Sequence, residues 1–340
     1  MPVLTHLSLP VVGAPMAGGI STPLLVAAVS DAGGLGMLAA GYLTPEQLAT
    51  DLVHTRDLTD RPFGVNLFVP RPPDQERHER AVTDLRTRLA PRAAALGVEP
   101  GHPVWGDTDG WADKVLLVET FAPAVVSCTF GLPDHATVRR WQAAGCEVHA
   151  TATSLREARD ACEVGVDALV LQGQEAGAHR ATHDPEAEPA PIDHLGLLEL
   201  VAPEVDLPLV AAGGITTAGD VRRALDAGAV AAQVGTALLL ATEAGTSATY
   251  RAALRDPALT QRVTTRAFTG RVAGAVRNGW VEELEGTVPS AFPVVDQITK
   301  PLRRAAAEAG DVHGIHVWAG TGWRAAQDRS AREIVLDLRP

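Results

Sequence analysis

Residues 209–217 read Leu209-Val210-Ala211-Ala212-Gly213-Gly214-Ile215-Thr216-Thr217, and this order of residues decides the fold. The apolar residues predict a buried strand, the paired glycines predict a tight turn, and the threonines predict the start of a helix. A similar unit occurs at Val234-Gly235-Thr236, which ends another apolar run. A strand that passes through a glycine turn into a helix is the repeating unit of parallel α/β proteins.

Other short apolar runs of this kind lie along the chain. With the two above, the strand candidates are Val11–Ala14, Leu35–Ala39, Phe63–Val69, Ala124–Thr129, Glu147–Thr151, Ala168–Leu171, Leu209–Ala212 and Ala231–Val234. Segments of helical spacing, most of them opened by Ser, Thr or Pro and closed near Gly, are Thr22–Ala32, Pro45–Arg56, Pro133–Ala144, Leu155–Val164, His194–Val201 and Thr217–Ala227. Strands that alternate with helices in this way predict an α/β fold of the (β/α)8, or TIM barrel, type.

Two segments interrupt the repeat. Residues 71–110 carry a charged helical stretch, Gln75–Leu96, and residues 239–310 follow the last strand with a mostly helical pattern. Both follow the carboxyl end of a strand, where barrels carry their active sites, so we expect these insertions to form a smaller, mostly helical second domain or lid. The predicted barrel then comprises residues 1–70, 111–238 and 311–340.

The composition excludes several classes of protein. The chain has 340 residues, of which 46% are hydrophobic and 21% are charged, enough for a large buried core. Its 41 acidic and 29 basic residues give a formal net charge of −12, and they form no lysine- or arginine-rich run. Nucleic acids and anionic membranes are therefore disfavoured as partners, because both attract basic surfaces.

Cysteine usage and the first residues of the chain favour the cytoplasm. Cys128, Cys146 and Cys162 are odd in number and widely spaced, so the sequence predicts neither a disulfide framework nor a metal site. The amino terminus lacks the pattern of an export signal, and no apolar run reaches the about 18 residues of a membrane span. We expect a soluble, cytoplasmic protein. The oligomeric state stays open, with a homodimer among the candidates.

His179 is the strongest candidate for a catalytic residue. It lies in the loop Gln172-Gly173-Gln174-Glu175-Ala176-Gly177-Ala178-His179-Arg180, directly after the apolar run Ala168–Leu171. Barrels place proton-transfer groups on loops at the carboxyl ends of strands, and a neutral imidazole accepts a proton near neutral pH. The alternative is a histidine that only orders its loop through a hydrogen bond.

Two glycine turns predict a phosphate site. Gly213-Gly214 and Gly235-Thr236 follow consecutive strands near the end of the barrel, where barrels often bind phosphate through backbone N–H groups. The alternative is that these glycines only allow tight turns.

Met16 and Asn66 predict contacts to a flat ring. Met16 lies among small residues after the first strand, and Asn66 lies in the third strand, where its amide can donate and accept hydrogen bonds. Such contacts suit a flavin. Packing in the core for Met16, and a strand end for Asn66, are the ordinary alternatives.

A set of short motifs runs along the whole chain. In order they are Ala14-Pro15-Met16-Ala17-Gly18-Gly19, Asp31-Ala32-Gly33-Gly34-Leu35-Gly36, Asn66-Leu67-Phe68, Ser127-Cys128-Thr129-Phe130-Gly131-Leu132-Pro133, the loop 172–180, Ala211-Ala212-Gly213-Gly214-Ile215, Phe268-Thr269-Gly270-Arg271, Arg277-Asn278 and Trp318-Ala319-Gly320. In order and spacing this set resembles the nitronate monooxygenase family, formerly called 2-nitropropane dioxygenases. The resemblance extends almost from end to end.

The resemblance implies a cofactor and a reaction. It implies an FMN-dependent barrel in which a nitronate gives an electron to FMN, dioxygen reacts with the reduced flavin, and a carbonyl compound and nitrite are released. It makes His179 the catalytic residue, a base where the substrate is a neutral nitroalkane. The FMN contacts that it implies are Pro15, Met16, Ala17, Asn66, Gln172, Gly177, Gly213, Gly214, Gly235 and Thr236.

The histidine loop departs from the family pattern. Relatives commonly read Gly-Gly-His-Arg-Gly where this chain reads Gly177-Ala178-His179-Arg180-Ala181. Alanine tolerates a positive φ poorly, so the loop either follows a different path or needs no such conformation at those positions. The shape of the pocket, and with it the substrate, stays open.

Other polar residues are weaker candidates. Arg271 and Arg277 are positioned to screen a cofactor or substrate charge if the second domain folds down, although arginines in such excursions usually face solvent or are paired. Glu175 is a candidate for tuning the pKa of His179, with a helix cap as the alternative. We expect Cys128 to be a small buried residue and no nucleophile.

Three rival functions remain, one of which is a phosphosugar isomerase barrel without FMN. An FMN-dependent NAD(P)H enoyl or quinone reductase resembles this group and carries a similar glycine-histidine loop. A non-catalytic flavin-binding protein is the rival of a different class, and the proton-transfer candidate argues against it.

Overall fold

The protein is a parallel eight-stranded barrel with a second region at its side. The computed structural model describes residues 2–340. The barrel strands are β1 Val11–Gly13, β2 Gly36–Ala39, β3 Phe63–Phe68, β4 Val125–Thr129, β5 Glu147–Ala152, β6 Ala168–Gln172, β8 Leu209–Ala212 and β9 Ala231–Val234. They pair in the order β1-β9-β8-β6-β5-β4-β3-β2, and a parallel bridge between Val12 and Leu35 joins the two ends of the sheet. The eight predicted strands and the barrel are confirmed.

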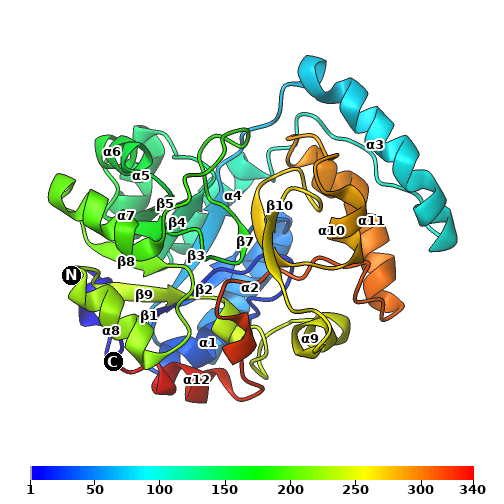
Figure 1. Ribbon diagram of the computed structural model, residues 1–340. Helices are drawn as coiled ribbons and strands as arrows, with labels where there is room; N and C mark the ends of the chain where they lie inside the picture. The colour runs from blue at the N-terminus through cyan, green and yellow to red at the C-terminus, as the bar shows by residue number, and fades with distance from the viewer. Residues whose placement is uncertain (1) are drawn as a thin grey trace.

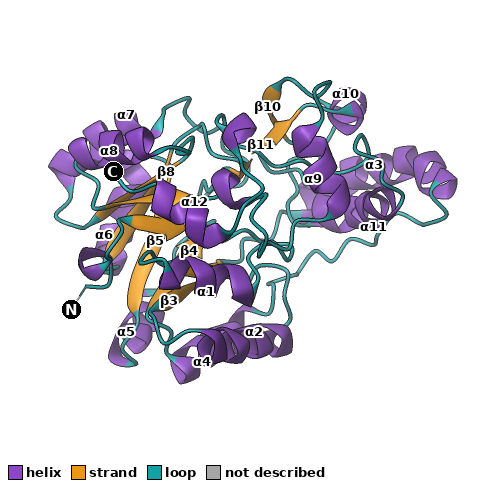
Figure 2. Cartoon of the chain, turned by 90° about the horizontal axis from the view of Figure 1, so that it is seen from below, coloured by secondary structure: helices purple, strands orange, loops and turns teal. Residues whose placement is uncertain are grey.

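Helices surround the barrel (Figures 1 and 2). They are α1 Pro23–Asp31, α2 Pro45–Leu58, α4 Trp111–Phe121, α5 His135–Ala143, α6 Leu155–Val164, α7 His194–Val201, α8 Ala218–Asp226 and α12 Ala331–Asp337. Short 3-10 helices are η1 Leu4–His6, η2 Ala202–Glu204, η3 Thr236–Leu238 and η4 Trp323–Ala325. The sequence did not predict α4 or α12, which close the third and the last βα unit after long insertions. No described helix is long and apolar enough to cross a bilayer.

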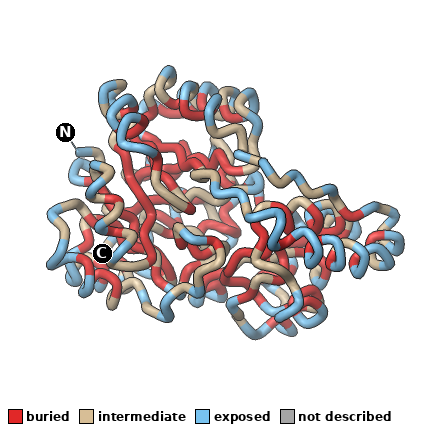
Figure 3. The backbone as a smooth tube through the Cα atoms, turned by 90° about the horizontal axis from the view of Figure 1, so that it is seen from above, coloured by how far each residue is buried: buried red, intermediate tan, exposed pale blue. Residues whose placement is uncertain are grey.

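Side chains on the strands alternate between two cores, as the pleat of a strand requires. In β6, Ala168 and Val170 belong to the cluster that also contains Val12, Met37 and Val210 from other strands, which fills the barrel. Leu169 and Leu171 belong instead to the larger cluster between the strands and the helices. Figure 3 shows this buried interior as a continuous region beneath exposed helices.

The two insertions pack on each other beside the barrel. They contain α3 Gln75–Ala95, α9 Ala248–Arg255, β10 Arg262–Thr265, β11 Ala273–Val276, α10 Gly279–Leu284 and α11 Val294–Glu308. Leu89 of α3 shares a separate hydrophobic cluster with Phe268, Trp280 and Ile298. Figure 1 shows α3, α10 and α11 together on one side of the molecule. The division at residues 71–110 and 239–310 stays a prediction, and this separate cluster supports it.

A small antiparallel sheet links the second region to the histidine loop. β10 pairs with β11, and β11 pairs with β7 Ala178–His179, so that Ala273 lies opposite His179 and Gly274 lies opposite Ala178. The sequence predicted a mostly helical insertion and missed this sheet. Its strands are short and, unlike the equally short barrel strands, they are not part of a repeating βα pattern that would mark them.

Candidate active site

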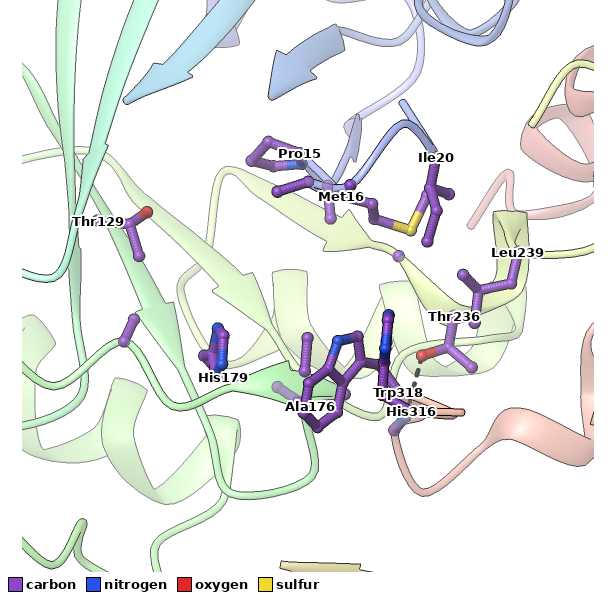
Figure 4. Close-up of a pocket in the computed structure, with 18 of the residues that line it drawn as sticks. Pro15, Met16, Ile20, Thr129, Ala176, His179, Thr236, Leu239, His316 and Trp318 are labelled. Carbon is purple, nitrogen blue, oxygen red and sulfur yellow. Dashed lines mark hydrogen bonds between the residues drawn. The ribbon is translucent and has the colours of Figure 1, made fainter. Parts of the chain in front are cut away.

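A cavity of about 430 Å³ lies at the carboxyl ends of the barrel strands, under the second region. Figure 4 shows Pro15 and Met16 across this cavity from His179 and Trp318. Every residue that the sequence predicted for the site lines it: His179, Pro15, Met16, Ala17, Asn66, Gln172, Gly177, Gly213, Gly214, Gly235 and Thr236. The structure therefore brings the predicted residues together, while their individual roles stay predictions.

His179 is held as a neutral imidazole. Its Nε2 lies 2.8 Å from Oγ1 of Thr269. The ring packs edge-on against Phe130 and Phe292, with Trp318 tilted beside it at a centroid distance of 5.3 Å. Burial lowers the pKa of His179 to about 3, and the positive charges of Arg271 and Arg303 add to this effect. The imidazole is therefore uncharged at neutral pH.

The loop before His179 keeps a left-handed conformation without glycine. Ala178 has φ 59°, whereas Ala181 is not among the described residues with positive φ. Gln172, at the end of β6, holds the loop through both ends of its amide. Its Nε2 donates to the His179 carbonyl at 3.1 Å, and its Oε1 accepts from Ala181 N at 2.9 Å. Of the two alanines in place of family glycines, only Ala178 occupies a strained position.

Replacing Ala178 with Gly should stabilise the protein. Glycine adopts φ 59° without the Cβ clash, but it also raises the entropy of the unfolded chain. We expect the free energy of unfolding to rise by up to about 1 kcal/mol, since the left-handed conformation costs an L-residue about 1–2 kcal/mol. Chemical denaturation of both proteins measures this difference. A loss of stability in Ala178→Gly would show that the alanine conformation is not strained.

Arg271 stabilises the histidine loop through hydrogen bonds to its backbone. It is only 2% exposed. Its Nε donates to the Arg180 carbonyl at 3.1 Å, its Nη2 donates to the Thr182 carbonyl, and its guanidinium lies 3.9 Å from the Phe130 ring centroid. Burial lowers the pKa of Arg271 to about 9, so it remains charged at neutral pH. Arg277, by contrast, is exposed and pairs with Glu282, away from the cavity lining.

Glu175 caps a helix and does not contact His179. Its Oε1 lies 2.8 Å from Nδ1 of His194 and accepts from the His194 backbone N–H at the start of α7. The helix-cap alternative for this residue is therefore the one that the structure supports. Cys128 is fully buried, and burial raises the pKa of its thiol, as expected for a residue that is no nucleophile.

Glycines form a tightly packed cradle at one end of the cavity. Gly213 and Gly214 have φ 115° and 71°, and a Cβ on Gly214 would lie 2.9 Å from Glu175 Cβ. A Cβ on Gly177 would lie 2.6 Å from the backbone nitrogen of Gly320. Gly320 N in turn donates to Thr236 Oγ1 at 3.0 Å. The turns after β8 and β9 thus meet the histidine loop and the segment at Gly320, which the sequence had not predicted as part of the site.

This cradle fits the phosphate of FMN. Within residues 2–340, the backbone N–H groups of Gly214, Gly235 and Thr236 donate to no protein acceptor. Thr236 begins η3, and free N–H groups at the start of a helical turn are suited to an anion. Their place on the cavity wall is the observation that supports a phosphate in this cradle.

The opposite wall fits a flat polar ring. Nδ2 of Asn66 donates to Ser127 Oγ and Thr129 Oγ1, both at 2.9 Å. Its Oδ1 has no hydrogen-bond partner among the described residues, so it can accept from a ligand in the cavity. Met16 lies in the loop after β1, where its backbone N–H donates to Ser21 Oγ at 2.9 Å. This wall matches the predicted flavin contacts.

The second region supplies polar residues that the sequence interpretation missed. Asp296, Lys300 and Arg303 of α11 line the cavity, together with Tyr42, Tyr250 and His316, and with Trp318, which lies in one of the sequence motifs. The spacing of four and three residues places the α11 group on one face of the helix, a signal that was present in the sequence. Tyr42 is held at φ 69° because its backbone N–H donates to Asp109, which pairs with Lys114 at 2.7 Å.

The closed barrel and its cavity at the carboxyl ends of the strands place the protein among the α/β-barrel enzymes. Comparison with known proteins narrows this class. The sequence model described as nitronate monooxygenase matches residues 2–340, and the chain belongs to that family. It is therefore an oxidoreductase, in a family of flavoproteins, as the motifs implied.

Individual relatives agree with this assignment. A probable nitronate monooxygenase of Staphylococcus aureus strain Newman is 35% identical over 335 residues, which cover 97% of this chain and 93% of the relative. The structure of nitroalkane oxidase from Streptomyces ansochromogenes is similar with a TM-score of 0.94 and 42% identity, covering 99% of this chain and 96% of that one. FabK from Thermotoga maritima shares the fold, with a TM-score of 0.74 and 24% identity over 98% of this chain and 93% of that one.

Proposed function

We propose that the protein uses FMN to oxidise nitronates, or the nitroalkanes from which they form, with dioxygen to a carbonyl compound and nitrite. The observation that carries this proposal is the single cavity that joins a neutral, partly buried His179 to a glycine cradle and to Asn66. When bound, FMN supplies the transfer of electrons from substrate to dioxygen, chemistry that amino-acid side chains do not supply. The nitroalkane oxidase relative supports the substrate class.

The residues that would hold FMN divide into two groups. The glycine cradle and η3 would bind the phosphate through backbone N–H groups, and the β1 loop and Asn66 would contact the ring. The complete proposed set is Pro15, Met16, Ala17, Asn66, Gln172, Gly177, Gly213, Gly214, Gly235 and Thr236. Gln172 already uses both ends of its amide on the histidine loop, so it also positions His179.

Thr269 would decide which nitrogen of His179 acts as the base. If Nε2–H donates to Thr269 Oγ1, the lone pair lies on Nδ1, which contacts no other described polar group. With a nitroalkane, the proton leaves the α-carbon and binds to Nδ1, and the electron pair of the C–H bond remains on the nitronate. The surrounding Phe130, Phe292 and Trp318 rings exclude water from this transfer.

Anaerobic mixing tests the reaction. The absorbance of the oxidised flavin should fall when the FMN-loaded protein is mixed with a preformed nitronate, and air should then yield nitrite with consumption of dioxygen. Stopped-flow absorbance and nitrite analysis follow the two steps. Bleaching by NADH or NADPH with no response to a nitronate would instead establish the reductase. Bound flavin without turnover of any nitro or quinone substrate would establish the non-catalytic binder.

The cytoplasmic location and a homodimer stay predictions from the sequence. A soluble small-molecule enzyme with net charge −12 is consistent with both. Neither bears on the residues that line the cavity.

A further inference from the structure

A second histidine, His316, lines the same cavity, and neither the sequence motifs nor the proposed reaction uses it. Its ring lies beside Trp318 at a centroid distance of 5.2 Å, and the ring of His179 lies 5.3 Å from the same tryptophan. Figure 4 shows the three side chains grouped on one side of the cavity. The two histidines therefore border the same part of the cavity.

Arg303 determines the tautomer of His316. Nη1 of Arg303 lies 2.7 Å from Nδ1 of His316. A guanidinium has only donors, so Nδ1 must accept, and in the neutral ring the proton resides on Nε2. Burial and the charge of Arg303 hold the pKa of His316 well below its usual range. His316 is thus a neutral imidazole that presents an N–H group.

The arginine is itself fixed on α11. Its Nη2 pairs with Asp296 Oδ1 at 2.5 Å, and its Nε donates to Thr299 Oγ1 at 3.3 Å. Both Arg303 and Asp296 are buried, so the pair has little freedom to release the imidazole. The charge of the guanidinium on Nδ1 also polarises the ring and strengthens Nε2–H as a donor.

The Nε2–H group opens on the cavity. It makes no hydrogen bond to any of residues 2–340, and it is not among the unpartnered polar atoms that are sealed from solvent there. A donor held in this way is suited to an oxygen atom that carries negative charge. Nitro and nitronate groups present two such oxygens.

We propose that His316 binds one oxygen of the nitro or nitronate group through Nε2–H, with Arg303 and Asp296 as the residues that position it. This rests on the proposed function, since it names the substrate group that the donor contacts. His179 would then accept a proton from carbon while His316 stabilises the charge that develops on oxygen. Arg303 has only donors and so fixes the tautomer of His316, whereas His179 contacts a threonine hydroxyl through Nε2.

Two substitutions separate this role from a structural one. Asn places an amide at the position of Nδ1, so His316→Asn keeps an acceptor for Arg303 and loses the cavity donor. Gln reaches the position of Nε2, so His316→Gln keeps the donor and loses the acceptor. We expect His316→Asn to lower kcat/KM for a nitronate by about tenfold to a hundredfold, as for loss of one hydrogen bond to a charged group, and His316→Gln to stay within about threefold.

Binding of nitrate, a planar anion with the same oxygen geometry, provides a readout without turnover. Calorimetry on the FMN-loaded protein should give a Kd about tenfold weaker for His316→Asn and little change for His316→Gln. The proposal would be overturned if His316→Gln bound nitrate more weakly than His316→Asn, or if the unmodified protein bound no nitrate. If the nitrate Kd values followed the expected order but no nitronate was turned over, the proposed function would be rejected. The assignment of His316 as an anion-binding donor would still stand.

Nitrogen NMR of histidine-labelled, unmodified protein tests the tautomer even if a variant folds poorly. The His316 signals, assigned by their absence in His316→Asn or by contact with Trp318, should show a proton on Nε2 and an Nε2 shift that moves when nitrate is added. A proton on Nδ1, or an Nε2 signal that ignores nitrate, would contradict the inference.

Discussion

Replacing His179 with Asn should abolish most activity on neutral nitroalkanes and spare most activity on preformed nitronates. Asn places its amide at the position of Nδ1, so it loses the Nε2 bond to Thr269 and has no basic nitrogen to accept the α-proton. General-base catalysis contributes about 10²–10⁴-fold, so we expect about a thousandfold loss of kcat/KM for the nitroalkane. For the nitronate, which needs no deprotonation, we expect kcat/KM to fall by less than about tenfold. Paired steady-state assays on one nitro compound in its two forms measure both effects.

The matched control is His78→Asn. His78 is also a buried histidine, bonded through Nε2 to Glu186 at 3.0 Å, but it lies on α3 outside the cavity lining. This variant should turn over both forms of the substrate at the unmodified rate. Equal losses on nitroalkane and nitronate in His179→Asn would reject a role as base alone and would show that the imidazole also holds the anion.

Replacing Gly214 with Ala should weaken FMN binding by about tenfold to a hundredfold. The residue has φ 71°, and the new Cβ would lie 2.9 Å from Glu175 Cβ and 3.0 Å from Thr321 Oγ1. The turn must shift, and its free N–H groups move with it, which costs about one charge-assisted hydrogen bond of about 1.5–3 kcal/mol. Titration of the apoprotein with FMN, followed by flavin fluorescence, measures the change in Kd.

Gly228→Ala separates backbone strain from loss of the cradle. Gly228 has φ 100° and no atom within 4 Å of an added Cβ, and it lies in the exposed turn after α8. Both variants should lose stability by about 1–2 kcal/mol, but only Gly214→Ala should lose FMN. An unchanged FMN affinity in Gly214→Ala would place the phosphate elsewhere in the cavity.

The barrel could be predicted because its signals are local. In each βα unit, the residues that predict the strand, the turn and the helix lie within about 20 residues of one another. Eight repeats of this pattern together predict the barrel. Where an insertion interrupted the pattern, the helix was not predicted. The N-cap of α4 is Gly110, which provides no side-chain hydrogen bond, and α12 follows a long insertion. The predicted site residues lay at strand ends, and the barrel brings strand ends together by construction.

The environment of the site could not be predicted in the same way. His179 bonds to Thr269, which is 90 residues away in the sequence, through a sheet whose β7 strand has two residues. Arg271 was expected near solvent or a cofactor charge, yet it is buried against the loop carbonyls. Such contacts depend on how segments distant in the sequence pack against each other, and the periodic pattern of one segment carries no information about its partner.

The sequence by itself determined the barrel, the position of His179 at a strand end and the glycine turns, because each depends on residues close together in the chain. Only the tertiary structure decided the protonation and the hydrogen-bond partners of the site histidines. Burial under the second region makes His179 neutral, Nε2 of His179 bonds to Thr269, and Arg303 makes His316 a donor through Nε2. These properties arise from solvent exclusion and from partners distant in sequence, which exist only after the insertions have packed over the barrel.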